Sequence, residues 1–204
     1  MFRNSGQVCV AGSRLLLQKP IAEEFTDKLL TTANALKVGD PLDLDSDVGA
    51  ISNEEQLLKD LEFVDVAQKE GATLATGGQR ILEDTGGYYM QPTVFTGVES
   101  HMTIAQEEVF GPVLSVIEFD DADDAVRIAN STPYGLAAGV WTSNLTTAHQ
   151  MVRAIRSGIV HVNCYGGAAI SLPMGGMKQS GNGYDRSLHA LDKFTNLKTA
   201  WFSL

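Results

Sequence analysis

The chain has 204 residues, of which 44% are hydrophobic and 20% are charged, a balance typical of a soluble globular protein of one domain or slightly more. Its formal net charge of −10 argues against a surface for nucleic acid or for an anionic membrane, because both partners need basic patches. No apolar run approaches the roughly 20 residues of a membrane span, and the two cysteines, Cys9 and Cys164, favour a reducing compartment such as the cytoplasm.

Strand-like and helix-like segments alternate along the first half of the chain. The apolar run 15–17 predicts a buried strand, and Pro20 opens a helical pattern with apolar residues at steps of three and four. Ser52 is expected to cap a second helix, with Glu55 as its capping-box partner. The expected buried face of this helix carries Leu58, Leu61 and Val64.

The second half of the chain continues the alternation. Strands are predicted at 73–75, within 88–96, at 113–117, at 139–141 and at 159–162. Helices are expected after the acidic pair Asp120 and Asp121 and over the segment 145–155. This order of elements predicts an α/β fold with a largely parallel open sheet flanked by helices. The apolar end, 199–204, has the composition of a further strand.

One thiol near the N-terminus stands among small and polar neighbours. It is Cys9, in the run 4–14 with the letters NSGQVCVAGSR. A free cysteine thiol has a pKa near 8.5, so only about 3% is thiolate at pH 7, and a catalytic cysteine needs a base, a cation or backbone amides nearby. The glycines Gly6 and Gly12 allow a close approach of the backbone to a substrate. On composition alone, a buried structural cysteine is the commoner interpretation.

Two further runs carry candidate chemistry. Residues 106–112, with the letters QEEVFGP, place paired carboxylates and an aromatic residue just before a Gly-Pro turn and a strand. Taken alone, Glu107 and Glu108 are a solvated pair and Phe110 a core residue. Residues 163–181 combine small apolar residues with the letters PMGGMKQSG, which taken alone indicate a structural loop.

In order and spacing, these runs resemble the catalytic half of the aldehyde dehydrogenase superfamily, over essentially the whole chain. The resemblance implies that Cys9 is the nucleophile: its thiolate attacks the aldehyde carbonyl, a hydride leaves to NAD or NADP, and water hydrolyses the resulting thioester to the acid. The Cys9 amide then supplies part of an oxyanion hole. The resemblance also implies that Glu108 accepts hydrogen bonds from a cofactor ribose, and that Phe110 packs beside the nicotinamide.

The resemblance further implies a substrate pocket. Its expected lining residues are Val8, Val10, Tyr165, Ile170 and Met174. Met174 stands where the family usually has phenylalanine, so the size of the pocket is left open. The segments 178–183, 187–191 and 193–195 look most like the branch that oxidises γ-glutamylaminobutyraldehyde and related amino aldehydes. A broad specificity for aliphatic or aromatic aldehydes fits the same residues.

The organisation expected from the resemblance is a catalytic domain over 1–190 and a tail with an oligomerisation strand over 191–204. A homodimer or homotetramer is therefore expected. In the family, the general base and the Rossmann domain that binds most of the NAD or NADP lie upstream of the cysteine. Neither is found in this chain, which is expected to be inactive alone. Four scattered histidines lack metal-ligand spacing, so no metal site is predicted.

Two alternatives stay open at this point. A cysteine hydrolase or acyltransferase needs a histidine poised on Cys9, and no histidine lies in a recognisable hydrolase signature. A non-catalytic fragment that pairs with other subunits through its terminal strand has the same expected fold. An upstream Leu-Gly-Gly motif with a glutamate distinguishes the enzyme from such a fragment.

Overall fold

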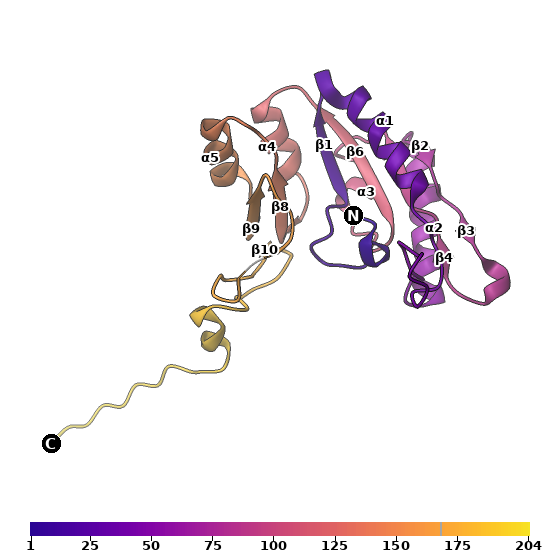
Figure 1. Cartoon of the computed structure of the whole chain (residues 1–204). Helices are drawn as coiled ribbons and strands as arrows, with labels where there is room; N and C mark the ends of the chain where they lie inside the picture. The colour runs from indigo at the N-terminus through magenta and orange to yellow at the C-terminus, as the bar shows by residue number, and fades with distance from the viewer. Residues whose placement is uncertain (168) are drawn as a thin grey trace. The chain divides into compact units, whose positions relative to one another are not determined.

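The computed structural model describes residues 1–167 and 169–204, which divide into two compact units, Met1–Thr132 and Pro133–Leu204 (Figure 1). Within the described residues, no helix is both long enough and apolar enough to cross a membrane. The predicted domain limits of 1–190 and 191–204 stay a prediction.

The first unit is built on a four-stranded sheet with the strand order β1-β6-β5-β2. Its strands are β1 (Arg14–Gln18), β6 (Val113–Phe119), β5 (Thr93–Thr96) and β2 (Thr73–Thr76). β1, β6 and β5 run parallel, and β2 is antiparallel to β5. Most of β6 is buried, as expected for a continuous apolar run in a parallel sheet. The predicted α/β fold with a largely parallel sheet is confirmed.

The helices of this unit cover both faces of the sheet. They are α1 (Lys19–Ala35), α2 (Glu54–Lys69), α3 (Thr103–Gln106) and α4 (Ala122–Asn130). Successive residues of β6 point to opposite faces: Val113 and Ile117 belong to the core cluster of α2, whereas Leu114 and Val116 belong to that of α1. The loop elements are η1 (Arg3–Gly6), β3 (Arg80–Ile81), η2 (Glu83–Thr85) and β4 (Tyr89–Met90).

The second unit repeats the strand–helix–strand pattern on a smaller scale. Its elements are β7 (Tyr134–Gly135), β8 (Ala137–Val140), α5 (Leu145–Ala154), β9 (Ile159–Val162), β10 (Met177–Lys178) and η3 (Leu188–Lys193). β8 and β9 are parallel and are connected through α5, while β10 is antiparallel to β7. The terminal residues 195–204 have no regular secondary structure and are exposed. The strand expected at 199–204 therefore stays a prediction.

The helix α2 differs from the prediction in its cap and in its buried face. Asn53, not Ser52, is the cap, and its side chain accepts a hydrogen bond from the backbone N–H of Gln56 at 2.8 Å. Leu58, expected on the buried face, is 57% exposed. The buried positions are Leu57, Asp60, Phe63, Val64 and Ala67. The hydrophobic pattern misassigned the face because a fully buried aspartate interrupts the apolar stripe.

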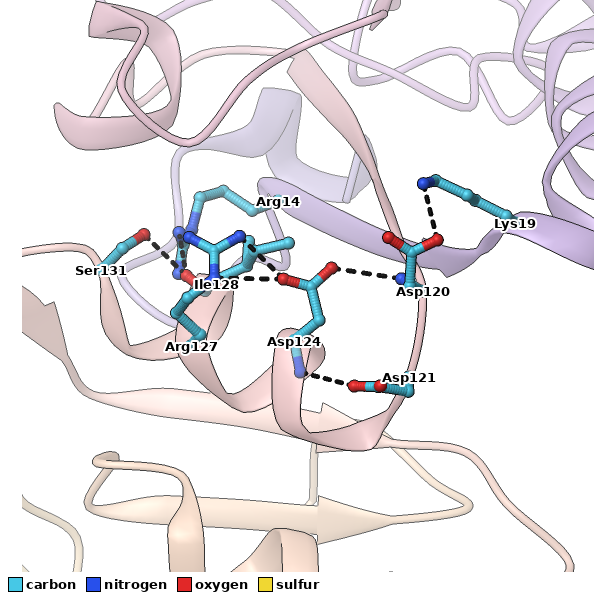
Figure 2. Close-up of polar contacts among 8 residues, drawn as sticks. All are labelled: Arg14, Lys19, Asp120, Asp121, Asp124, Arg127, Ile128 and Ser131. Carbon is cyan, nitrogen blue, oxygen red and sulfur yellow. Dashed lines mark hydrogen bonds and ion pairs between the residues drawn. The ribbon is translucent and has the colours of Figure 1, made fainter.

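Arg14, the last residue of the cysteine run, joins β1 to the C-terminal end of α4. Its guanidinium donates hydrogen bonds to the carbonyl oxygens of Ile128 at 3.3 Å and of Ala129 at 2.9 Å (Figure 2 draws the first). The last carbonyls of a helix carry partial negative charge, so a cation there is stabilising. At the other end of α4, Asp121 accepts from the backbone N–H of Asp124 at 2.9 Å, which confirms that the acidic pair begins this helix.

We expect Arg14→Met to lower the free energy of unfolding by about 1–3 kcal/mol, because it leaves the carbonyls at the end of α4 without their charged donor. Urea unfolding measures this change. Arg127→Met is the matched control, since the Arg127 side chain is 65% exposed and pairs with Asp124 on the same helix. The control should lose at most about 1 kcal/mol. Equal losses in both variants contradict the assignment.

Candidate active site

Cys9 lies in a tight turn between η1 and β1. The Val8 carbonyl accepts a hydrogen bond from the N–H of Ala11 at 2.8 Å, so Cys9 and Val10 are the central residues of a β-turn. Cys9 is exposed, whereas Val8 and Val10 are half-buried. Within the described part of the chain, the backbone N–H of Cys9 makes no hydrogen bond. The turn therefore carries an exposed cysteine whose amide, within the described residues, has no hydrogen-bond partner.

The segment before this turn is fixed to the loop that leads into α2. Ser5 and Gly6 adopt left-handed backbone conformations, with φ of 54° and 71°. The buried Ser5 donates its hydroxyl hydrogen bond to the carbonyl of Gly49 at 2.7 Å. The Gln7 side chain accepts from the N–H of Ser52 and donates to its hydroxyl, both at 3.0 Å. These three hydrogen bonds restrict the position of the cysteine turn.

A backbone contact brings the cysteine run against the run 106–112. A Cβ atom placed on Gly6 would lie 2.1 Å from the carbonyl oxygen of Gly111, so the two backbones touch and no larger residue fits. The positive φ of Gly6 also favours glycine. The cysteine run and the run 106–112 are therefore neighbours in space although about a hundred residues separate them in sequence.

Glu108 and Phe110 are both exposed, and the residue between them is buried. Phe110 is 37% exposed and has a φ of 61°, whereas Val109 is only 5% exposed. A bulky residue with positive φ is a conformational outlier, and such outliers cluster at functional sites. The structure thus contradicts the interpretation of Phe110 as a core residue. It presents a carboxylate and an aromatic ring on one short segment.

Gln56 and Asp60 of α2 lie beneath this segment, and sequence reasoning missed both. The Gln56 Nε2 atom donates to the Val109 carbonyl at 2.8 Å and to Asp60 Oδ1 at 2.7 Å. Burial raises the pKa of Asp60 to about 7, against the opposing effects of the Gln56 hydrogen bond and of the Lys59 charge. The sequence signal for Asp60 is its helical spacing: it lies three residues after Leu57 and four before Val64, on the same face of α2 as these apolar residues.

The remaining predicted pocket residues lie in the second unit. Tyr165 is 38% exposed and stacks on Trp141 with ring centroids 6.2 Å apart, and burial raises the pKa of its hydroxyl. Ile170 is 78% exposed, and Met174 forms an isolated β-bridge with Asp185. The placement of Tyr165, Ile170 and Met174 in one pocket with Val8 and Val10 stays a prediction.

An exposed cysteine lies in a run that contacts, through Gly6 and Gly111, the run of an exposed carboxylate and an exposed aromatic residue. On a largely parallel α/β sheet, this arrangement defines a candidate cysteine-dependent enzyme. The Aldehyde dehydrogenase family model matches residues 1–200, so the chain belongs to the aldehyde dehydrogenase family. This finding confirms the resemblance seen in the sequence. Betaine aldehyde dehydrogenase of Rhizobium etli (strain CIAT 652) is 42% identical over 204 residues, which cover 100% of this chain and 42% of that protein.

Solved structures of the family are also similar to the chain. The γ-glutamyl-γ-aminobutyraldehyde dehydrogenase of Burkholderia cenocepacia J2315 matches with a TM-score of 0.92 and 54% identity, over 97% of this chain and 40% of that one. An indole-3-acetaldehyde dehydrogenase in complex with NAD⁺ matches with a TM-score of 0.94 and 50% identity, over 99% of this chain and 41% of that one. The chain thus spans about two fifths of the length of these relatives.

Proposed function

We propose that this chain supplies the nucleophile and part of the cofactor site of an NAD(P)-dependent aldehyde dehydrogenase, which oxidises an aldehyde to a carboxylic acid. The observation that carries the proposal is the Gly6–Gly111 contact, which brings the run of Cys9 against the run of Glu108 and Phe110 in a member of this family. The NAD⁺ complex of a chain that is 50% identical supports the choice of cofactor.

Cys9 performs the covalent part of the proposed reaction. Its thiolate attacks the aldehyde carbon and forms a thiohemiacetal, and the negative charge develops on the former carbonyl oxygen. The free N–H of Cys9 is a suitable donor to that oxygen, because backbone amides stabilise such oxyanions without reorganising. Oxidation of the adduct leaves a thioester on Cys9, and water then releases the acid and restores the thiol.

Glu108 and Phe110 fit the cofactor assigned to them. An ionised carboxylate only accepts hydrogen bonds, so an exposed Glu108 suits the hydroxyl pair of a ribose. An exposed phenylalanine ring suits a flat aromatic cofactor ring. When bound, the nicotinamide supplies the acceptor for the hydride that leaves the thiohemiacetal. Since Val109 is buried between the two residues, their positions relative to the fold are fixed.

Glu108→Gln is expected to change the cofactor KM or the rate of hydride transfer at least tenfold. The substitution keeps the shape of the side chain but removes a charge-assisted hydrogen bond worth about 1.5–3 kcal/mol. Steady-state and single-turnover kinetics of the complete gene product measure both quantities. The control is Glu107→Gln, because Glu107 is the exposed neighbour with no assigned role. If both parameters are unchanged in Glu108→Gln, the cofactor assignment is wrong.

We propose amino aldehydes of the γ-glutamylaminobutyraldehyde type as substrates. Two observations support this choice: the 54% identity to the Burkholderia enzyme, and the resemblance to that branch in the segments 178–183, 187–191 and 193–195. The alternative is a broad specificity for aliphatic or aromatic aldehydes. Comparison of kcat/KM between γ-glutamylaminobutyraldehyde, an aliphatic aldehyde and an aromatic aldehyde separates the two, since similar values for all three support the alternative.

We propose that the segment 199–204 adds a strand to the sheet of another subunit, giving a homodimer or homotetramer in the cytoplasm. Trp201 is 90% and Phe202 is 84% exposed, and an apolar segment of this kind gains stability when a partner covers it. Light scattering of the chain with and without these residues measures the assembly.

The expected inactivity of the 204-residue chain alone is tested by assaying it for aldehyde-dependent reduction of NAD⁺ or NADP⁺.

A further inference from the structure

Asp60 is a carboxyl group in the middle of the buried stripe of α2. The residue is 0% exposed, and its neighbours along the stripe are the apolar residues Leu57, Val64 and Ala67. Its Oδ1 atom accepts the hydrogen bond from Gln56 Nε2 at 2.7 Å. Within the described residues, its Oδ2 atom is buried and has no hydrogen-bond partner. Burying a polar group costs free energy, so an apolar residue in this position is the better choice for stability alone.

The hydrogen bond to Asp60 determines the orientation of the Gln56 amide. A side-chain NH₂ group has two hydrogens, and Gln56 Nε2 directs one to Asp60 and the other to the Val109 carbonyl at 2.8 Å. Without the carboxyl oxygen, the amide is free to rotate away from Val109. Val109 is the buried residue between Glu108 and Phe110, so its carbonyl belongs to the peptide that joins it to Phe110.

The Asp60 carboxyl group also packs against Gly111. A Cβ atom on Gly111 would lie 2.1 Å from Asp60 Oδ2, and the carbonyl of the same glycine is in contact with Gly6. Asp60 therefore supports the segment 108–111 at two points, through Gln56 at Val109 and directly at Gly111. The cysteine run contacts the second of these points, because Gly6 touches the carbonyl of Gly111.

We propose that Asp60 is a positioning residue for the cofactor-binding segment: its carboxyl orients Gln56, and Gln56 fixes the Val109 peptide between Glu108 and Phe110. This inference rests on the proposed function of Glu108 and Phe110. Asp60 itself acts from inside the fold, through Gln56 and through its contact with Gly111.

The test compares Asp60→Ala with Asp60→Asn in the complete gene product. Alanine removes the acceptor for Gln56, and we expect the cofactor KM to rise about three- to tenfold, the range that corresponds to one hydrogen bond. Asparagine keeps an acceptor oxygen in the same place, so its cofactor KM should stay within about twofold of the parent value. The aldehyde KM and kcat should change less than the cofactor KM. If Asp60→Ala does not fold, Asp60→Leu replaces it, because leucine fills the volume without accepting a hydrogen bond.

Two controls separate positioning from a structural role. Val64→Ala removes buried volume from the same helix face, and it should lower the melting temperature without raising the cofactor KM. In a Gln56→Met background, Asp60→Ala should raise the cofactor KM by clearly less than it does alone, because the part of its effect that passes through Gln56 is already lost. Additive effects of the two substitutions, or equal KM values in Asp60→Asn and Asp60→Ala, would overturn the proposal.

Glu108→Gln, measured in the same assays, separates the cofactor role proposed for Glu108 from the positioning role proposed for Asp60. If Glu108→Gln leaves the cofactor step unchanged, the proposed function of this segment fails. If Glu108→Gln impairs the cofactor step and Asp60→Ala does not, the positioning role of Asp60 alone fails.

Discussion

Replacing Cys9 with alanine is expected to abolish aldehyde oxidation, whereas Cys164→Ala should retain most of it. Loss of a covalent nucleophile typically lowers kcat by a factor on the order of 10⁴ or more. Cys9 lies in an anchored turn that touches the segment of Glu108 and Phe110 through the Gly6–Gly111 contact. Cys164 follows β9 and has no role assigned to it by the motifs. Initial rates of the complete gene product, with saturating aldehyde and cofactor, measure the difference.

Cys164→Ala is the matched control because both cysteines are exposed and both substitutions remove the same atom. Neither side chain belongs to a buried core cluster, so the far-ultraviolet circular dichroism of both variants should match the parent. Equal losses of activity in two well-folded variants would show that Cys9 is not the nucleophile.

Asp60→Asn is expected to change the dependence of stability on pH. The pKa of Asp60 is raised by burial from 3.8 to about 7, so the folded chain holds this proton more tightly than the unfolded chain does. The resulting contribution to stability is fully present below pH 4 and is lost as the pH rises through 7. A shift of about three units corresponds to about 4 kcal/mol between these limits. Relative to the parent, Asp60→Asn should therefore gain up to about that amount between pH 4 and pH 8.

Urea unfolding of the parent and the variant at pH 4, 6 and 8 measures this gain. Asp65→Asn is the control, because Asp65 is exposed on the same helix and its substitution removes a carboxylate from the surface without changing a buried position. A free-energy difference between the parent and Asp60→Asn that stays constant over this range contradicts the burial of the Asp60 carboxyl group.

The main strands and helices of this fold were predictable because their signals are local. The continuous apolar run of β6, the proline in the first turn of α1 and the acidic cap of α4 each specify an element within a few residues. The buried face of α2 was not predictable from the same rules. A hydrophobic pattern treats Asp60 as exposed, and only the packing of α2 under the segment 108–111 places it inside.

The candidate site was predictable in part. The motif around Cys9 and the motif around Glu108 identified the two runs, but no local pattern reports that Gly6 and Gly111 touch. The exposure of Phe110 was likewise hidden, because an aromatic residue before a buried strand is usually a core residue. Such features depend on contacts between distant segments and on backbone conformation.

The role of Cys9 as the nucleophile is tested by mass spectrometry of the complete gene product, quenched in acid during turnover with an aldehyde and NAD⁺. We predict that the peptide containing Cys9 gains the mass of the acyl group, that the added mass requires both reagents, and that hydroxylamine removes it as expected for a thioester. The peptide containing Cys164 should stay unmodified, and the Cys9→Ala variant should carry no acyl group. Acylation of Cys164 in place of Cys9, or acylation of the Cys9→Ala variant during turnover, would contradict the account.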